Sequence, residues 1–363
     1  MKSKELSNLR GPFRAPRAGV DICLSICIGI CAAACLSGCV SACAPGAIGQ
    51  MGTPEALFPP VFERLETGDS RTITLSFDKE AAFLEPPEVS PALPVSSAAS
   101  DGSEIIVTFD EDQEAGTEYL LSGTVADAEG NRMRLIVPFY GYNPNPPSVL
   151  LNEFTTQGSS AKPDCVELAV IRGGNTAGLC VYQGTRNSFT DRKILPPIAV
   201  AAGDFVIIHW KPQAVSDEKD ETTDKGESGG LMSSGDAWDL WVQGGTGLSG
   251  NNGVLTLYSS PTGHLLDGVL YSNRTSGSDT NYAGFGSQSV YERALELAEE
   301  EGWAVSGDSI APEDGINPDD STATRSMCRA SASADTNSAA DWHIVPTGKA
   351  SFGAVNSDEV YTP

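Results

Sequence analysis

The chain has 363 residues and a formal charge of −25, from 48 acidic and 23 basic side chains. A chain this acidic is repelled by phosphate backbones, which argues against nucleic acid as a partner. Hydrophobic residues make up 40 % of the sequence, enough for buried cores, and the 38 glycines and 23 prolines favour many turns and an all-β fold.

The first 38 residues have the layout of a secretory signal peptide. A basic stretch, residues 1–17, precedes an apolar run from Ala18 to Val40. Near its end stands Leu36-Ser37-Gly38-Cys39, which resembles the lipobox of bacterial lipoproteins. The resemblance implies cleavage before Cys39 and acylation of this cysteine with a diacylglyceryl group and fatty acids such as palmitate. Several acyl chains would hold the protein on the cell membrane or outer membrane.

Two alternatives remain for this segment. Val40-Ser41-Ala42-Cys43 is a second near-match to the lipobox, so Cys43 is the alternative lipidation site. The apolar run is also nearly long enough to serve as an uncleaved membrane anchor, which needs about 20 residues.

Six of the nine cysteines recur every four residues at positions 23, 27, 31, 35, 39 and 43, on one face of a helix. In a signal segment cysteine acts as a small apolar residue, so we predict no metal site there. Cys165, Cys180 and Cys328 remain. Export permits a disulfide, and Cys165 and Cys180, on neighbouring predicted strands, are the candidate pair. The alternative is that each is a buried apolar residue.

Residues 39–57 are small and Gly-rich and predict an acylated tether. Strand patterns follow over residues 58–142, beginning with Arg71–Phe77, whose alternation places Ile73, Leu75 and Phe77 on one face. Further strands are predicted at 104–109, 116–123 and 132–139. Short strands divided by turns predict a β-sandwich.

This first module resembles the bacterial Ig-like modules of surface proteins. The matching residues are ITLSFDKE at 73–80, GTEYLLSGTVAD at 116–127 and the turn that closes at Asn131. In that turn Asp127, Glu129 and Asn131 are weak candidates for Ca²⁺ ligands, because hard oxygen atoms gather there. We favour the alternative of a Gly-Asn hairpin turn.

A Pro-rich hinge at 143–147 leads to a second module, residues 148–356. It resembles the lamin-tail domain, an Ig-like β-sandwich, so the chain is predicted to hold two such modules. The resemblance rests on SVLLNEF at 148–154, DCVEL at 164–168, the strands at 195–208 and 253–269, Arg325, the segment DTNSAADW at 335–342, and the closing FGAVN at 352–356.

Two insertions interrupt this resemblance. Residues 212–235 are charged and poor in hydrophobic residues, which predicts a mobile loop. Residues 289–320 begin with a predicted helix, capped by Ser289 and Glu292, whose residues Val290, Ala294 and Leu297 share one face. We favour packing of this helix against the sandwich over partner binding. The acidic loop after it, which includes Asp308 and Glu313, is expected to be solvated.

No familiar catalytic motif is present: His-Glu-x-x-His, Gly-x-Ser-x-Gly and the phosphate loop are all absent from the sequence. Asn152 and Glu153 at a strand end are interpreted as structural, and so is His343. Alternation places Asp164 and Glu167 on opposite faces, so they form no carboxylate pair for glycoside hydrolysis. Trp238 and Trp241 are more consistent with core packing than with a sugar-stacking platform.

The sequence therefore predicts a lipid-anchored envelope protein, facing the periplasm or the cell surface, with a binding or scaffolding role and no evident catalysis, cofactor or metal. The expected partners are the membrane, through the lipid, and an unknown protein or glycan. The alternatives are a cation-dependent adhesin and a hydrolase whose site is built from loops. Fold alone does not decide among them.

Overall fold

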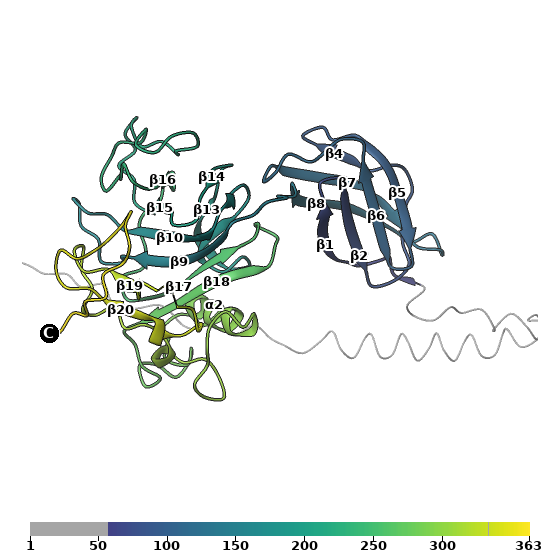
Figure 1. Ribbon diagram of the computed structural model, residues 1–363. Coiled ribbons are helices and arrows are strands. Elements are labelled where there is room, and N and C mark those ends of the chain that lie inside the picture. The colour runs from purple at the N-terminus through teal and green to yellow at the C-terminus, as the bar shows by residue number, and fades with distance from the viewer. Residues whose placement is uncertain (1–56, 333) are drawn as a thin grey trace, which may run out of the picture. The chain divides into compact units, whose positions relative to one another are not determined.

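The computed structural model describes residues 57–332 and 334–363. The predicted signal peptide, lipidation sites Cys39 and Cys43, and almost all of the predicted tether lie outside this range. Within it the regular secondary structure is almost entirely strand, joined by long loops, with one α-helix and two 3₁₀ turns (Figure 1). The predicted all-β class is confirmed.

The first eight strands form two sheets around one core. One sheet has the order β1-β2-β6-β5, and the other joins β7 to β3 and β4 on one side and to β8 on the other. The predicted face of Ile73, Leu75 and Phe77 is buried between them. The strands are β1 (Phe62–Asp69), β2 (Thr72–Phe77), β3 (Ala82–Phe83), β4 (Glu88–Ser90), β5 (Val95–Asp101), β6 (Glu104–Phe109), β7 (Glu118–Ala126) and β8 (Arg132–Tyr140).

The remaining strands form a larger sandwich with its own core. A six-stranded sheet has the order β16-β15-β10-β9-β19-β20, a four-stranded sheet has the order β13-β12-β17-β18, and β11 pairs with β14. The strands are β9 (Ser148–Phe154), β10 (Cys165–Arg172), β11 (Gly174–Asn175), β12 (Cys180–Gly184), β13 (Phe189–Ile194), β14 (Ala199–Val200), β15 (Phe205–His209), β16 (Trp238–Trp241), β17 (Asn252–Tyr258), β18 (Leu265–Ser272), β19 (Met327–Arg329) and β20 (Trp342–Ile344).

Helix α2 (Gln288–Glu299) covers part of this core. Ala294 and Leu297 are buried and Val290 packs beside them, as the helical spacing predicts. The predicted cap at Ser289 is wrong: the helix begins at Gln288, and the Ser287 hydroxyl accepts the Val290 N–H. Ser287 and Ser289 are both suited to the N-cap position. Ser287 is the cap in a helix whose apolar stripe, Val290, Ala294 and Leu297, packs on the core. The 3₁₀ turns are η2 (Pro312–Asp314) and η3 (Ala339–Asp341).

Residues 212–235 form turns without a strand or helix, yet they are tied to the sheet. The buried Glu221 carboxylate accepts the backbone N–H groups of Ser228 and Asp239, at 2.8 Å each. The Glu218 carboxylate accepts the Gln213 N–H at 2.7 Å. Acidic side chains that the composition places in a charged, solvated loop therefore satisfy backbone donors here.

Candidate functional site

One face of the six-stranded sheet carries polar side chains that are buried. Cross-strand pairing aligns Asp239, Ile207, Glu167, Glu153, Cys328 and His343 in one row across all six strands. The adjacent row holds Trp241, His209 and Cys165. The other face of the same strands packs into the core of the sandwich. We call these two rows the polar face.

A β-bulge in β9 shapes the polar face. Glu153 lies opposite Glu167, but the next pair is Leu151 with Leu168, so Asn152 is an extra residue in the strand. Leu151 and Phe154 both point into the core. The bulge therefore lets two consecutive residues, Asn152 and Glu153, lie on the polar side, which strict alternation forbids.

Residues 351–357, here named the covering segment, lie over the two glutamates. Ser351 donates its N–H and hydroxyl to Glu153, at 2.9 and 2.7 Å, and the Gly353 N–H donates to Glu167. The Ser326 hydroxyl also donates to Glu153. Burial raises the pKa of Glu153, and these hydrogen bonds oppose the rise. Burial raises the pKa of Glu167 well above its ordinary value, and the charge of Glu153 adds to this.

Asn152 and Asn356 extend the hydrogen bonding between the polar face and the covering segment. Their side-chain amides exchange two hydrogen bonds, at 2.9 and 3.0 Å, and Asn152 also donates to Glu167 at 2.8 Å. Asn356 donates further to the Arg329 carbonyl. Asn152 and Glu153, interpreted from the sequence as structural, are bonded here to a segment about two hundred residues away in sequence.

A cysteine and a histidine of the second row and the Asp239 carboxylate of the first row form a hydrogen-bonded chain. The His209 ring lies with Nδ1 3.4 Å from the Cys165 Sγ and Nε2 2.8 Å from an Asp239 oxygen, and it stacks on Trp241 at 3.8 Å. This is the order of nucleophile, base and orienting group in thiol hydrolases. All three have no exposed surface, however, and burial raises the pKa of the Cys165 thiol well above its ordinary value. Here the thiol stays protonated, and the trio acts as a buried hydrogen-bonded chain.

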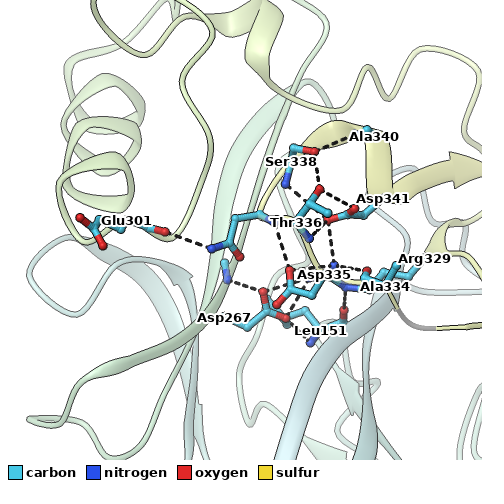
Figure 2. A network of polar contacts seen from close by, with 12 residues as sticks. Leu151, Asp267, Glu301, Arg329, Ala334, Asp335, Thr336, Ser338, Ala340 and Asp341 are labelled. Atoms are coloured by element: carbon cyan, nitrogen blue, oxygen red, sulfur yellow. Dashed lines mark hydrogen bonds and ion pairs between the residues drawn. The ribbon is translucent and has the colours of Figure 1, made fainter.

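On the core side, a buried arginine joins three aspartates (Figure 2). The Arg329 guanidinium has no exposed surface and binds Asp267 at 3.0 Å, Asp335 at 3.2 Å and Asp341 at 3.3 Å. It also donates to the Leu151 carbonyl at 2.7 Å. The network ties β9, β18 and β19 to the turn that precedes β20.

Arg325, the arginine quoted for the lamin-tail resemblance, takes no part in this network. Arg325 instead lies over the Tyr361 ring, 4.1 Å from its centroid. Spacing along the chain could not separate two arginines four residues apart. The sequence did contain one signal of this network: Asp267 stands inside the apolar run LLDGVL, and a carboxylate that is buried there needs a counterion.

Cys165 and Cys180 do not pair: they lie on different sheets, in separate apolar clusters, and all three described cysteines are free. The disulfide prediction is wrong because β10 and β12 are not neighbours.

Asp164 lies apart from Glu167. Its carboxylate accepts the Gly158 and Leu248 N–H groups and so caps a loop. Trp238 and Trp241 are buried, as core packing predicts.

The acidic turn of the first sandwich is closed by its own residues. The Asp127 carboxylate accepts the Asn131 backbone and side-chain N–H groups, both at 2.9 Å, and pairs with Lys79 at 2.7 Å. These partners, Asn131 first, lower the Asp127 pKa to about 2. Glu129 is exposed. Within the described residues, no group of three potential metal-binding side chains comes together.

Two surface pockets flank the six-stranded sheet. One, of about 160 Å³, is lined by Asn152, Gly203, Asp204, Val355 and Asn356, among others. The second, of about 320 Å³, lies beside β20. In the described part of the chain, no helix is long and apolar enough to cross a membrane.

These features define an all-β protein whose polar face is sealed by its own chain. A family model described as TP_1001 protein second domain matches residues 147–344, more than half of the sequence, and the chain belongs to this family. An uncharacterized protein of Treponema pallidum (strain Nichols) is 25 % identical over 168 residues. This match covers 46 % of the chain and 42 % of that relative, so the chain spans less than half of the relative's length.

Among solved structures, a DUF4876 family protein from Bacteroides thetaiotaomicron VPI-5482 aligns with 79 % of this chain and 94 % of its own. The identity is 12 % and the TM-score is 0.27.

Proposed function

We propose that this protein is a lipid-anchored component of the bacterial envelope that acts by binding or scaffolding. The anchor is Cys39, with Cys43 as the alternative, and the folded part is held beyond a short tether. The partner is a protein or glycan at the envelope.

The burial of the polar face supports a binding role over catalysis. Glu153, Glu167, His209, Asp239 and Cys165 are groups of the polar face that could do acid–base or nucleophilic chemistry, and none of these five has exposed surface, whereas His343 at the edge of the face is partly exposed. Each is bonded to the chain itself. Catalytic groups must reach a substrate, whereas these groups fix the covering segment and β16 in place.

We also propose that the two sandwiches are an Ig-like and a lamin-tail-like module. The support for the second is that motif residues of the resemblance come together: Asp335 and Asp341 bind one arginine, and Asn152 bonds to Asn356 of the closing motif.

Membrane fractionation and protease accessibility on intact cells test this proposal. We expect the wild-type chain in the membrane fraction with fatty-acid label, and Cys39→Ala in the soluble exported fraction, with Cys43→Ala as the matched control. A Cys39→Ala chain that stays labelled and membrane-bound would refute this anchor. Removal of the folded part by external protease places the partner outside the cell, and protection places it in the periplasm.

A further inference from the structure

The covering segment lies over the six-stranded sheet without joining it as a strand. Within the described residues, its only backbone–backbone hydrogen bond is internal, from the Ala354 N–H to the Ser351 carbonyl at 2.8 Å. Upstream of it, the Gly348 N–H donates to the Thr324 carbonyl, and Gly348 has a positive φ of 80° with no heavy atom within 4 Å of where a side chain would begin. The segment can therefore move about Gly348 without breaking a strand pair.

Two carboxyl groups hold this segment on the sheet. Glu153 accepts the Ser351 N–H and hydroxyl, and Glu167 accepts the Gly353 N–H. The further polar links are those of Asn356 with Asn152 and Arg329, and those of the Ser357 carbonyl with His343 and Cys328. The strength of the attachment therefore depends on the state of the two carboxyl groups.

The donors that meet this carboxyl pair are neutral. They are hydroxyls, a side-chain amide and backbone N–H groups. His343 favours the charge of Glu153, whereas the charge of Glu153 opposes that of Glu167. The ionisable groups around the pair are Cys165 of β10, His209 of β15, Asp239 of β16, Cys328 of β19, His343 of β20, Asp358 just beyond the segment and, on the core side of β19, the aspartate-bound Arg329.

We propose that the covering segment is a pH-operated strap, which closes the polar face while the glutamate pair holds a proton and lifts when both glutamates are charged. Two carboxylates that face one another away from water repel each other, and neutral donors compensate this only in part. Lifting the segment admits water to both. It also removes Phe352 from the cluster of Cys165, Ile207 and Ala237, so the polar face becomes accessible. This inference goes beyond the proposed binding role and does not depend on the lipid anchor.

The direction of the response follows from the closed state. Burial raises the pKa of Glu153, and it raises the pKa of Glu167 well above the ordinary value of 4.5. Both groups return toward this ordinary value once water reaches them, so opening releases protons. Closure is therefore strongest below pH 4.5 and weakens as the pH rises through the pKa values of the closed state.

Hydrogen exchange of the full chain, read by mass spectrometry at about pH 5 and about pH 7, tests the strap. Each exchange rate is divided by the intrinsic rate at that pH, which gives a protection factor. We expect the protection of residues 351–357 to fall by about tenfold between the two conditions, because opening releases about one proton. Residues 252–258 of β17 should stay far more protected throughout, since the sandwich remains folded when the segment lifts.

Three variants separate the carboxyl pair from a general weakening. Glu167→Gln should reduce the fall to less than about threefold, because one ionisable group is gone. Ser351→Ala removes one donor to Glu153 and should lower the protection about fivefold at both pH values. Ser357→Ala, the matched control in the same segment, should change it by less than about twofold, because Ser357 meets the sheet through its carbonyl.

Two outcomes would overturn the inference. The first is wild-type protection of residues 351–357 that is equal or greater at the higher pH. The second is exchange of these residues only together with β17, which would mean that the segment opens by unfolding of the whole sandwich. Residues 104–109 of β6, in the other sandwich, contain no part of the carboxyl pair and should keep their protection in both conditions.

Discussion

Glu153 and Glu167 stand directly opposite one another on β9 and β10, both without exposed surface, and both accept hydrogen bonds from the covering segment. Two carboxyl groups in such proximity resist ionising together. The protonation of the two glutamates is therefore linked to the hydrogen bonds that attach residues 351–357 to the sheet.

This pair predicts that stability falls as pH rises from the acidic side. A carboxyl with a raised pKa in the folded state binds its proton more tightly there than in the unfolded chain. The folded protein therefore begins to lose stability above the ordinary glutamate pKa of 4.5, and the loss is complete once pH exceeds the folded pKa. A tenfold difference in proton affinity between the two states corresponds to about 1.4 kcal/mol.

Urea unfolding across a pH series measures this effect, with Glu167→Gln as the isosteric variant. The variant should remove much of the pH dependence. Its amide oxygen can accept from either Asn152 or Gly353, whereas its NH2 group cannot accept from the other, so one of the two hydrogen bonds is lost. Glu129→Gln, at an exposed turn, is the matched control and should follow the wild-type profile. A wild-type curve that rises through this pH range, with an identical curve for Glu167→Gln, would contradict the prediction.

Loss of the buried arginine should be severe. Arg329→Met removes the partner of Asp267 and Asp341 and leaves two carboxylates buried without a counterion. We expect a loss of roughly 3–5 kcal/mol in the free energy of unfolding, or failure to accumulate folded protein. Arg134→Met should change this free energy by less than about 0.5 kcal/mol. Equal urea midpoints for the two variants would show that the network contributes little.

The three described cysteines should behave as protected thiols. Cys165, Cys180 and Cys328 are buried and unpaired, and burial raises the pKa of each thiol. Alkylation followed by mass spectrometry of the peptides should show labelling only after unfolding, because the thiolate is the reactive form. Recovery of a Cys165–Cys180 cross-linked peptide from native protein would restore the disulfide interpretation.

The start of helix α2 offers a local test. Ser287→Ala removes the hydroxyl that accepts the Val290 N–H and is expected to cost about 1 kcal/mol of stability. Ser289→Ala, inside the helix, tests the cap expected from the sequence and should be nearly neutral. Thermal unfolding of the two variants side by side decides between them. A larger loss for Ser289→Ala would place the cap where the sequence pattern put it.

Periodicity in the sequence determined the local elements of this protein. Alternation over residues 71–77 predicted the buried face of Ile73, Leu75 and Phe77, and helical spacing predicted that Ala294 and Leu297 share a buried side. Alternation also separated Asp164 from Glu167. These features depend on the backbone repeat of each element, which is a local property of the chain.

Only the tertiary structure decided which distant residues meet. The bulge at Asn152, the pairing of Glu153 with Ser351, and the ion pair of Arg329 with Asp267 all depend on strand register and order. A shift of one residue would send these side chains to the other face of the sheet. Register is set by the packing of the whole sandwich, so composition and spacing defined an all-β chain but could not assemble its polar face.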